Sequence, residues 1–571
     1  MKETTKQYCE FLRHQAKRRF DKVRHTWCDL LRWGLPHKSS WILSQTQGER
    51  KNQHIVDPTH ILAQRSYVAG FLEGNTSASR PWYRAGVKDG DVMEDFEAKE
   101  WLQHFTQRTL TNLGTSNFYH SAGNFYYDYS TVNTGAHYIE TLKNGFHFHT
   151  LIPGSYFVLD NAYGEAEILI REFALNVKSI VDKYGKFNSS GLRDWSNISK
   201  HVRKSYEDGD YSRMMDLVHL VLPNPDFEVD RPERPDNRKW LELTYELGTA
   251  GAHGSSEAQE FVQSPDIGKD IFLKRYTGKR KPFIVGKSTD DFEYGEKGPT
   301  LDALGLIKSL NKKALSKDQA LEQMLSPTLQ GPASLRKSYI STAANTFIPI
   351  DGRSASRNQK LESVFQISPA IGAVIQDVGD LRQIVDKIYY ADFLLFLSKN
   401  PKTRTATEAN AIVEEQQRII GPNLQSLNRT YNVPVVEWVM DWTLFEDPYL
   451  KPVPKILEGK TLRPEFVSVF AQAQKAADLP AIDRYLGMIA NVAQIDPKIL
   501  DKANLDKLAD LYEDRLYLPS GLNNPQDKVD AQREQSMREA KRQQALEQTI
   551  PAVAKAAKDA SQIQQPNQQE V

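Results

Sequence analysis

The hydrophobic and polar positions form two long helical patterns in the middle of the chain. The first runs from about Leu301 to Leu325 and ends at Ser326-Pro327, because proline has no backbone N–H to donate. The second begins at Pro369, a favourable first-turn residue, and places apolar residues at alternating steps of three and four. These residues are Ile371, Val374, Val378, Leu381, Val385 and Ile388. Each helix, roughly 35–45 Å long at ~1.5 Å per residue, has a narrow apolar seam that we expect to pack against other helices.

A polar stretch, residues 328–368, separates the two helices. Its short apolar pieces, such as Phe347-Ile348-Pro349-Ile350, predict brief strands, and the stretch is too long for a plain linker. Its basic residues outnumber Asp351 and Glu362, and they are Arg336, Lys337, Arg353, Arg357 and Lys360. The pattern predicts a small α/β module at the end of the helix pair.

A basic loop, residues 398–405, follows the second helix. It carries Lys399, Lys402 and Arg404 and no acidic residue. Thr405 can cap the helix that follows, which is expected to end near Gly421-Pro422. Two interpretations stay open for the three charges: a solvated surface loop that caps a helix, or a contact with a polyanion.

Strand-like alternation is typical of residues 116–290, for example in Phe146-His147-Phe148-His149 and Tyr156-Phe157-Val158-Leu159. Further short strands are expected at 240–245 and 282–285. We therefore predict an α+β domain around a mainly antiparallel sheet. Helical patterns surround it, over residues 1–50, 98–113 and 424–444.

The order and spacing of several short motifs resemble one known family. The motifs are Tyr294-Gly295, Gly298-Pro299, Leu301-Asp302-Ala303-Leu304, Ile307-Lys308-Ser309-Leu310-Asn311 and Thr405-Ala406-Thr407-Glu408-Ala409, with further matches at 116–119, 134–136, 152–156, 171–173 and 183–185. Together they resemble the head–tail connector, or portal, proteins of short-tailed bacteriophages, from about residue 50 to 515. Such proteins place a small clip between two stem helices, and a tunnel loop then leads into a wing helix.

The resemblance implies an α+β, helix-rich portal fold, with an α/β wing, long paired stem helices, a clip and a C-terminal helical crown or barrel. The domains expected are residues 1–298 for N-terminal helices and wing, 299–327 for stem helix 1, 328–368 for the clip, 369–397 for stem helix 2, 398–405 for the tunnel loop, 406–475 for wing helices, and 476–571 for crown and barrel or tail.

The function implied by the resemblance is that of a portal at one capsid vertex. Twelve copies are expected to form a ring around a channel for packaging and ejection of double-stranded DNA, which passes without sequence specificity. The expected partners are the terminase packaging motor, tail adaptor and tail proteins, the scaffold and the major capsid protein. Assembly is expected in the cytoplasm of a host bacterium, and the product in the virion. The alternative is another structural or tail adaptor protein without a DNA channel.

Three groups of residues receive roles from the same resemblance. The DNA-facing tunnel loop would contain Lys399, Lys402 and Arg404, and the stem packing seam would contain Val374, Val378, Leu381 and Val385. The clip residues that would contact partners are Arg336, Lys337, Arg353 and Arg357.

Composition and charge fit this picture. Lys plus Arg and Asp plus Glu both number 73, so the formal net charge is +0. A protein that binds nucleic acid tightly over its whole surface is more often basic, so DNA contacts are expected to be local and weak. Cys9 and Cys28 are the only cysteines, which excludes a disulfide scaffold and fits a reducing compartment. No run of about 18 apolar residues predicts a membrane span.

Residues that suggest an enzyme fail on spacing or context. His137, His147 and His149 lack the accompanying ligands of a metal site, and we interpret them as strand histidines. Gly286-Lys287-Ser288-Thr289 follows a strand like a phosphate loop but lacks the preceding glycine and the following helix. Asp290-Asp291 is interpreted as a solvated turn. No enzymatic activity, metal or cofactor is expected.

The two ends of the chain leave alternatives open. Lys17-Arg18-Arg19, in the first helix, is either a solvated face or a nucleic-acid contact. Residues 526–571 contain eleven Gln and a thin apolar stripe, which fits either a disordered tail or a helical barrel of identical chains.

Overall fold

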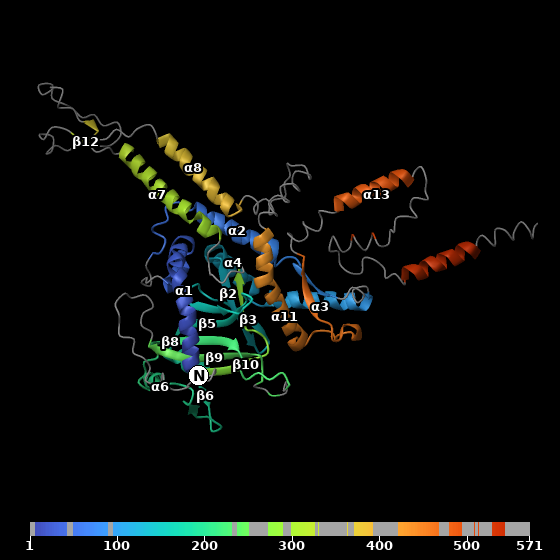
Figure 1. Ribbon diagram of the computed structural model, residues 1–571, viewed down its shortest axis with the longest axis horizontal. Helices are drawn as coiled ribbons and strands as arrows, with labels where there is room; N and C mark the ends of the chain where they lie inside the picture. Colours follow the sequence, from blue (N-terminus) through green and yellow to red (C-terminus); the bar gives the residue numbers. More distant parts are fainter. Residues whose placement is uncertain are drawn as a thin grey trace, which may run out of the picture. The chain divides into compact units, whose positions relative to one another are not determined.

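The computed structural model describes residues 6–42, 50–88, 95–230, 234, 237–249, 272–288, 298–325, 329–330, 362–363, 371–391, 421–467, 479–493, 508, 512 and 528–542. The chain divides into two compact units. The first comprises residues 1–82, 108–450 and 468–470, and the second comprises residues 83–107, 451–467 and 471–571. Figure 1 labels their elements along the chain.

A five-stranded antiparallel sheet, in the order β10-β9-β8-β5-β4, lies at the centre of the first unit. Its strands are β4 (Tyr156–Asp160), β5 (Ala166–Asn176), β8 (Met214–Pro223), β9 (Trp240–Thr249) and β10 (Lys274–Gly278). Helix α1 (Lys6–Gly34) packs on one face, where its apolar side joins Leu220 and Leu222 in one core. Val221, which points the other way, joins the core on the opposite face. The predicted N-terminal helix and antiparallel sheet are confirmed.

A three-stranded antiparallel sheet, in the order β11-β2-β3, packs on that opposite face. Its strands are β11 (Phe283–Lys287), β2 (Thr134–Leu142) and β3 (Gly145–Thr150). The shared core contains Tyr138 and Phe283 from this sheet and Leu169 from the larger one. Smaller elements of the same unit are η1 (Pro36–Trp41), α5 (Val177–Tyr184), β6 (Lys186–Phe187), β7 (Arg193–Asp194) and α6 (Lys200–Glu207).

Helix α4 (Phe118–Val132) covers the three-stranded sheet and is an element that the sequence reasoning missed. Its ring of Phe125 stacks on Tyr431 at 3.7 Å between centroids. A Cβ added to Gly135 or Gly286 would meet that ring at 2.6 and 2.4 Å, respectively. Both glycines are therefore needed so that the strands can approach α4 closely. The π-helix η5 (Asn428–Asn432) and helix α11 (Val433–Glu446) complete this layer.

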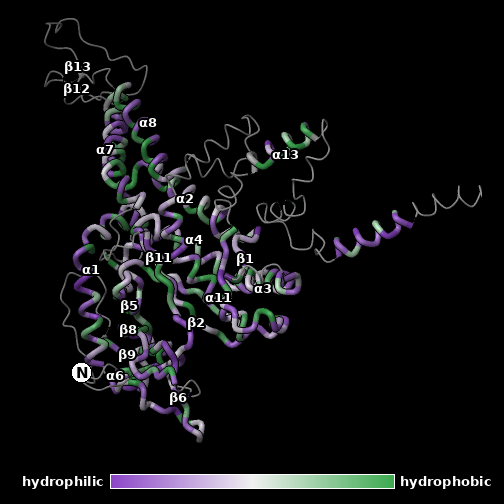
Figure 2. The backbone as a smooth tube through the Cα atoms, turned by 45° about the vertical axis from the view of Figure 1, so that its right-hand side comes forward, coloured by the Kyte–Doolittle hydropathy of each residue, from purple (hydrophilic) through white to green (hydrophobic). Residues whose placement is uncertain are grey.

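The two long helices predicted from the sequence are present as α7 (Pro299–Leu325) and α8 (Ile371–Ile388). They lie side by side in both views (Figures 1 and 2), and Figure 2 shows polar and apolar residues interspersed along them. Two short strands, β12 (Leu329–Gln330) and β13 (Glu362–Ser363), pair in the segment that joins them. Helix α2 (Thr59–Asn75) contacts both α4 and α8.

Helix α8 ends at Ile388, and Tyr390 adopts a left-handed backbone with φ 53°. A left-handed residue interrupts a right-handed helix, and the buried ring of Tyr389 lies at this position. Stem helix 2 was predicted to continue to residue 397; residues 392–397 lie outside the described residues, so this bound stays a prediction.

In the second unit, β1 (Tyr83–Val87) pairs antiparallel with β14 (Leu462–Phe466). Helix α3 (Phe96–Thr115) begins in this unit, and its predicted helical pattern is confirmed. Thr106 Oγ1 accepts a hydrogen bond from the backbone N–H of Ala85 at 2.9 Å. The unit also contains η6 (Lys455–Leu457), α13 (Leu479–Ala493) and a helical segment, residues 528–542.

Candidate functional site: the helix pair and its seat

Helices α7 and α8 bury some of their apolar residues and leave others in solvent. Ile307 and Leu310 of α7 and Val378 and Val385 of α8 are buried. Seven large apolar side chains of the pair are exposed in the single chain, by 37 to 81%. We call five of them the flank residues: Leu315, Leu321, Leu325, Ile375 and Ile384.

The flank residues of α8 lie on both sides of its buried line. At 3.6 residues per turn, Ile375 is about 60° to one side of Val378, and Ile384 is about 120° to the other. Ile375 is 53% and Ile384 44% exposed. A helix that carries apolar residues on both flanks of a buried line has more apolar surface than its partner helix covers.

The four seam residues predicted from the sequence differ in burial. Val378 and Val385 are buried, Leu381 is half-buried, and Val374 is 37% exposed. Val374 lies in the first turn of α8, whereas the buried residues Val378 and Val385 lie closer to its C-terminal end.

Two ion pairs fix the pair of helices. Lys313 Nζ of α7 lies 2.5 Å from Asp377 Oδ2 of α8, where both groups are exposed. Arg382 donates to Asp57 Oδ2 at 2.7 and 3.0 Å from two of its nitrogens, and this carboxylate is buried. Burial disfavours the Asp57 carboxylate, but hydrogen bonds from Thr59 and from Arg382 outweigh burial, so its pKa is lowered. The second pair therefore contributes more to stability than the first.

The segment that holds Asp57 is itself fastened to α7. Asn311 Oδ1 accepts hydrogen bonds from the backbone N–H groups of Val56 and Asp57, at 2.7 and 2.9 Å. Asn311 is buried, and its amide donates to Ile307 O at 2.8 Å. The residues before α2 thus connect α7 to α8 through hydrogen bonds to the buried groups of Asn311 and Asp57.

The C-terminal end of α8 meets the start of α7 at a buried hydroxyl pair. Tyr389 Oη and Thr300 Oγ1 are 2.7 Å apart, and Thr300 Oγ1 donates to Ser130 O of α4 at 2.8 Å. Tyr67 of α2 places its ring edge-on to Tyr389, with centroids 6.5 Å apart. Burial raises the pKa of Tyr389, so its hydroxyl stays neutral. We call Ser130, Thr300 and Tyr389 the seat of the helix pair.

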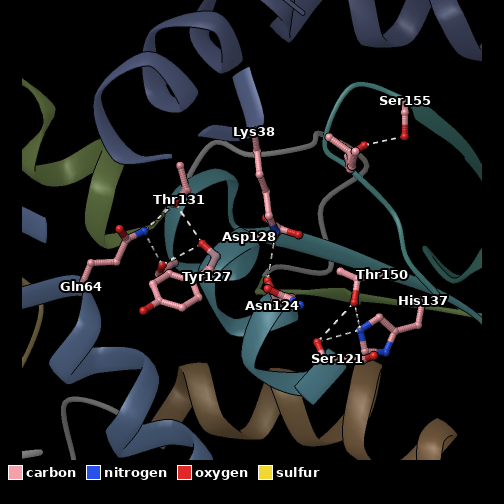
Figure 3. Close-up of polar contacts among 12 residues, drawn as sticks. Lys38, Gln64, Ser121, Asn124, Tyr127, Asp128, Thr131, His137, Thr150 and Ser155 are labelled. Carbon is pink, nitrogen blue, oxygen red and sulfur yellow. Dashed lines mark hydrogen bonds and ion pairs between the residues drawn. The ribbon is translucent and has the colours of Figure 1, made fainter. Parts of the chain in front are cut away.

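Helix α4 is held in place by polar side chains, which Figure 3 shows in close-up. Gln64 of α2 donates to Ser130 Oγ at 2.9 Å and to Thr131 Oγ1 at 2.7 Å. Lys38 Nζ lies 2.6 Å from Asp128 Oδ1. Burial raises the pKa of Asp128 to about 6, although Lys38 opposes the shift. These contacts orient the carbonyl of Ser130 that receives Thr300.

The three histidines considered as metal ligands do not come together. His137 is buried on the α4 side of β2, where its Nε2 lies 3.2 Å from Ser121 O, and burial lowers its pKa to about 3. His147 and His149 lie on the other face, and His149 pairs with Glu140 at 2.9 Å. In the described part of the chain, no cluster of three or more His, Cys, Asp or Glu side chains could hold a metal ion.

The segment that resembles a phosphate loop has a structural role. Gly286 and Lys287 belong to β11, where Thr430 Oγ1 contacts the backbone N–H and the carbonyl of Lys287 at 3.1 and 3.0 Å. Lys287 Nζ lies 2.5 Å from the buried Asp160 carboxylate. The lysine is therefore already paired, and its strand is fastened to the helix that follows residue 420.

Two groups of predicted site residues, and the acidic turn, lie outside the described residues: Lys399, Lys402 and Arg404 of the basic loop; Arg336, Lys337, Arg353 and Arg357 of the polar stretch; and Asp290-Asp291. Asp57, Arg382 and Tyr389 were missed by sequence reasoning. Asp57 and Arg382 are 325 residues apart and Tyr389 and Thr300 are 89 residues apart, so no local sequence pattern predicts these contacts.

None of the helices within the described ranges combines the length and apolar character that a membrane crossing requires.

Comparison with known proteins places the whole architecture in a recognised group. The model of a family described as "Bacteriophage head to tail connecting protein" matches residues 6–261 and 275–522. The "Portal protein" of Salmonella phage epsilon15 is 26% identical over 557 residues, which cover 96% of this chain and 94% of that protein. The "Probable portal protein" of Bordetella phage BPP-1 is 28% identical over 528 residues, which cover 91% of this chain and 89% of that protein.

Proposed function

This chain belongs to the family of bacteriophage head-to-tail connecting proteins and acts as a portal protein, and we propose that it does so as a closed ring of identical chains. In this proposal α7 and α8 are the stem helices and line a channel for double-stranded DNA. The ring has twelve members, as the resemblance implies, and occupies one vertex of the capsid. It is a structural component of the virion, without an enzymatic step, assembled in the host cytoplasm.

The observation that carries the proposal is the exposure of the flank residues. A closed ring uses two different surfaces of each subunit, one against each neighbour. Ile375 and Ile384, on opposite sides of the buried line of α8, supply one apolar contact for each neighbour. Exposed apolar patches of this kind mark interaction surfaces in soluble proteins.

The predicted seam takes a specific role in this arrangement. Three seam residues pack within one chain and set the distance between its stem helices: Val378, Leu381 and Val385. The fourth, Val374, faces a neighbouring chain together with Ile375. The seam and the flank residues together give each stem helix an inner and an outer set of contacts.

The clip and the tunnel loop take the roles that join the ring to DNA and to other proteins. The packaging motor and the tail adaptor contact the clip at Arg336, Lys337, Arg353 and Arg357. The scaffold and the major capsid protein contact the wing. Lys399, Lys402 and Arg404 face the DNA. With 73 basic and 73 acidic residues, the chain has a net charge of +0, which keeps phosphate contacts few. Each fixed phosphate contact adds affinity that DNA must break as it slides.

Electron microscopy and sedimentation of the purified protein test the ring. Wild type is expected to form rings with a central hole of DNA width. Ile375→Lys and Ile384→Lys are expected to leave the thermal unfolding temperature unchanged, because both residues are exposed in the single chain, and to shift the protein to monomers.

Gln383→Lys, an exposed polar position on the same helix, is the matched control and keeps the ring. Rings of normal stability in both isoleucine variants would remove the flank residues from the interface. A wild type that never forms rings would favour the tail adaptor alternative.

A further inference from the structure

A row of polar residues crosses the face of the five-stranded sheet that is otherwise apolar. Strand register places Arg171 of β5 opposite His219 of β8, His219 opposite Thr244 of β9, and Thr244 opposite Lys274 of β10. Residues directly opposite each other in antiparallel strands share one face. Leu169, two residues before Arg171, belongs to the core on this face, so the row lies at the edge of that core.

The row forms the floor of a cavity of about 480 Å³. The three-stranded sheet supplies one wall, through Tyr138, Glu140 and His149, and α5 supplies another, through Ser179 and Tyr184. Cavities of this size hold small molecules in many proteins. Most of the lining residues carry a polar or charged group, including the cations Arg171, Lys183 and Lys274 and the carboxylates Glu140 and Asp182, although apolar atoms supply more of the lining surface.

Two carboxylates near the row already have partners, and a third, Asp182 of α5, also lines the cavity. Glu242 Oε2 accepts from Tyr138 Oη at 3.0 Å and lies 3.4 Å from His219 Nε2. Glu140 accepts from His149 at 2.9 Å and lies 3.9 Å from Lys183 Nζ. The hydrogen bond from His149, aided by Lys183 and opposed by burial, lowers the pKa of Glu140 to about 2.

Two cations of the floor have no such partner. Among the described residues, neither Arg171 nor Lys274 forms a hydrogen bond or an ion pair; Arg171 lies over the ring of Phe173 at 4.8 Å and Lys274 over that of Tyr276 at 5.1 Å. An arginine has five N–H donors and a lysine three. Partly buried donors without an acceptor are costly, and burial lowers the pKa of Arg171.

The next residue of β5 gives a direct comparison. Glu172 points to the α1 face, where Arg13 Nη1 lies 2.7 Å from Glu172 Oε1 and Arg13 also contacts Glu10 at 2.9 Å. The two arginines lie on opposite faces of the same sheet, and Arg13 forms ion pairs with two carboxylates. Arg171 feels the charge of Glu140 across the cavity but has no hydrogen bond or ion pair within the described residues, so its N–H donors are left without an acceptor.

We propose that this cavity binds a small dianion of the class of inorganic phosphate and phosphate monoesters, held by Arg171 and Lys274. Adjacent strands are about 4.8 Å apart, so the backbones of Arg171 and Lys274 are about 14 Å apart, and an anion held by both would lie over His219 and Thr244 between them. The guanidinium fork and the ammonium group then bind different oxygens of one tetrahedral anion. A phosphate offers more oxygens than a single carboxylate and carries a second negative charge, which suits two cations. The site is independent of the DNA channel.

Calorimetric titration of the purified ring with inorganic phosphate, in chloride buffer, tests the proposal. Wild type is expected to bind one phosphate per chain saturably. Arg171→Gln and Lys274→Gln are expected to weaken binding by at least about tenfold each. Arg275→Gln is the matched control, because Arg275 is the next residue of β10, points to the other face and is half exposed. Its affinity for phosphate should equal that of wild type.

Glycerol phosphate, titrated in parallel, distinguishes a free ion from an ester, since tighter binding of the ester would show that its substituent also occupies the cavity. Without phosphate, Arg171→Gln should unfold at the wild-type temperature or above it, because the substitution removes an unpaired cation. If Arg171→Gln unfolds at a lower temperature than wild type, the phosphate affinity of Lys274→Gln alone tests the proposal. No saturable heat with wild type, or unchanged affinity in Lys274→Gln, would overturn the proposal.

Discussion

The sheet body of the first unit and its helix pair use apolar residues in opposite ways. Along β8, successive residues enter the core under α1 and the core under the three-stranded sheet in turn, so one chain buries both faces. Along α7 and α8, one line is buried and the flank residues remain in solvent. In the proposed ring, the sheet body is therefore complete within one chain, whereas the helix pair requires neighbouring chains to cover its flank residues. The contrast separates folding from assembly within a single unit.

Substitution of Phe125 should have the largest effect, because its ring fills the contact between α4, two strand glycines and Tyr431. Phe125→Ala is expected to lower the free energy of unfolding by about 3–5 kcal/mol, since the cavity cannot collapse around two glycines. Chemical denaturation measures the loss. Tyr163→Ala, at an 81% exposed side chain, is the control and should change stability by less than about 0.5 kcal/mol. Equal effects of the two substitutions would contradict the assignment of a closed core.

A charge in the buried line of α8 should affect both folding and assembly. Val378→Asp places an unpaired carboxylate at a position that is 3% exposed, which is expected to cost about 2–3 kcal/mol and to separate α8 from its partner helix. Sedimentation should then show monomers or aggregates instead of rings. This differs from the flank variants, which leave the single chain stable. Intact rings of Val378→Asp would mean that the seam does not hold the helix pair together.

Removal of the ion pair between Arg382 and Asp57 should lower stability by less than the two core substitutions above. Arg382→Ala leaves the buried Asp57 without its cation and is expected to cost about 1–2 kcal/mol at neutral pH. Lys313→Ala, which removes the exposed pair with Asp377, should cost less than about 0.5 kcal/mol. Thermal unfolding of both variants measures the difference. A larger loss in Lys313→Ala would contradict the role given to burial.

The same pair has a pH dependence with a defined sign. The pKa of Asp57 is lowered by folding, so its ionised form adds stability above the ordinary value of 3.8, and that stability is lost as pH falls through and below it. Wild type should therefore lose more stability than Arg382→Ala between neutral and acidic pH. Parallel curves for the two proteins would show that Arg382 contributes nothing to the shift.

Local patterns predicted what depends on neighbours along the chain. The heptad-like steps of α8 and the alternation of β4 and β9 need only a few residues to be recognised, and these elements are present. Helix α4 was missed because its many aromatic residues resemble a strand. A helical spacing was nevertheless available in the line Phe118, Ala122, Phe125, Tyr129 and Val132, all of which are buried.

Tertiary contacts explain what local patterns could not predict. The interruption of the helix after Ile388 lies where Tyr389 is buried against Thr300 and Tyr67, which are distant in sequence. The polar row of Arg171 and Lys274 depends on the register of four strands, and a sequence alone does not fix register between strands that are far apart.

Replacement of the three basic residues of the loop should have the smallest effect on the fold, because the proposed function gives these residues a role in DNA contact alone. In the proposed function, Lys399, Lys402 and Arg404 of every subunit form a positive collar around DNA. Replacing all three with Gln should leave the unfolding temperature and the ring unchanged. Binding of DNA to the ring at low salt should weaken, and its dependence on salt should become shallower, because fewer counterions are released. Particles carrying the variant should retain packaged DNA less well or eject it differently. If instead the particles package, hold and eject full genomes like wild type, the loop is only a solvated connection that caps the next helix.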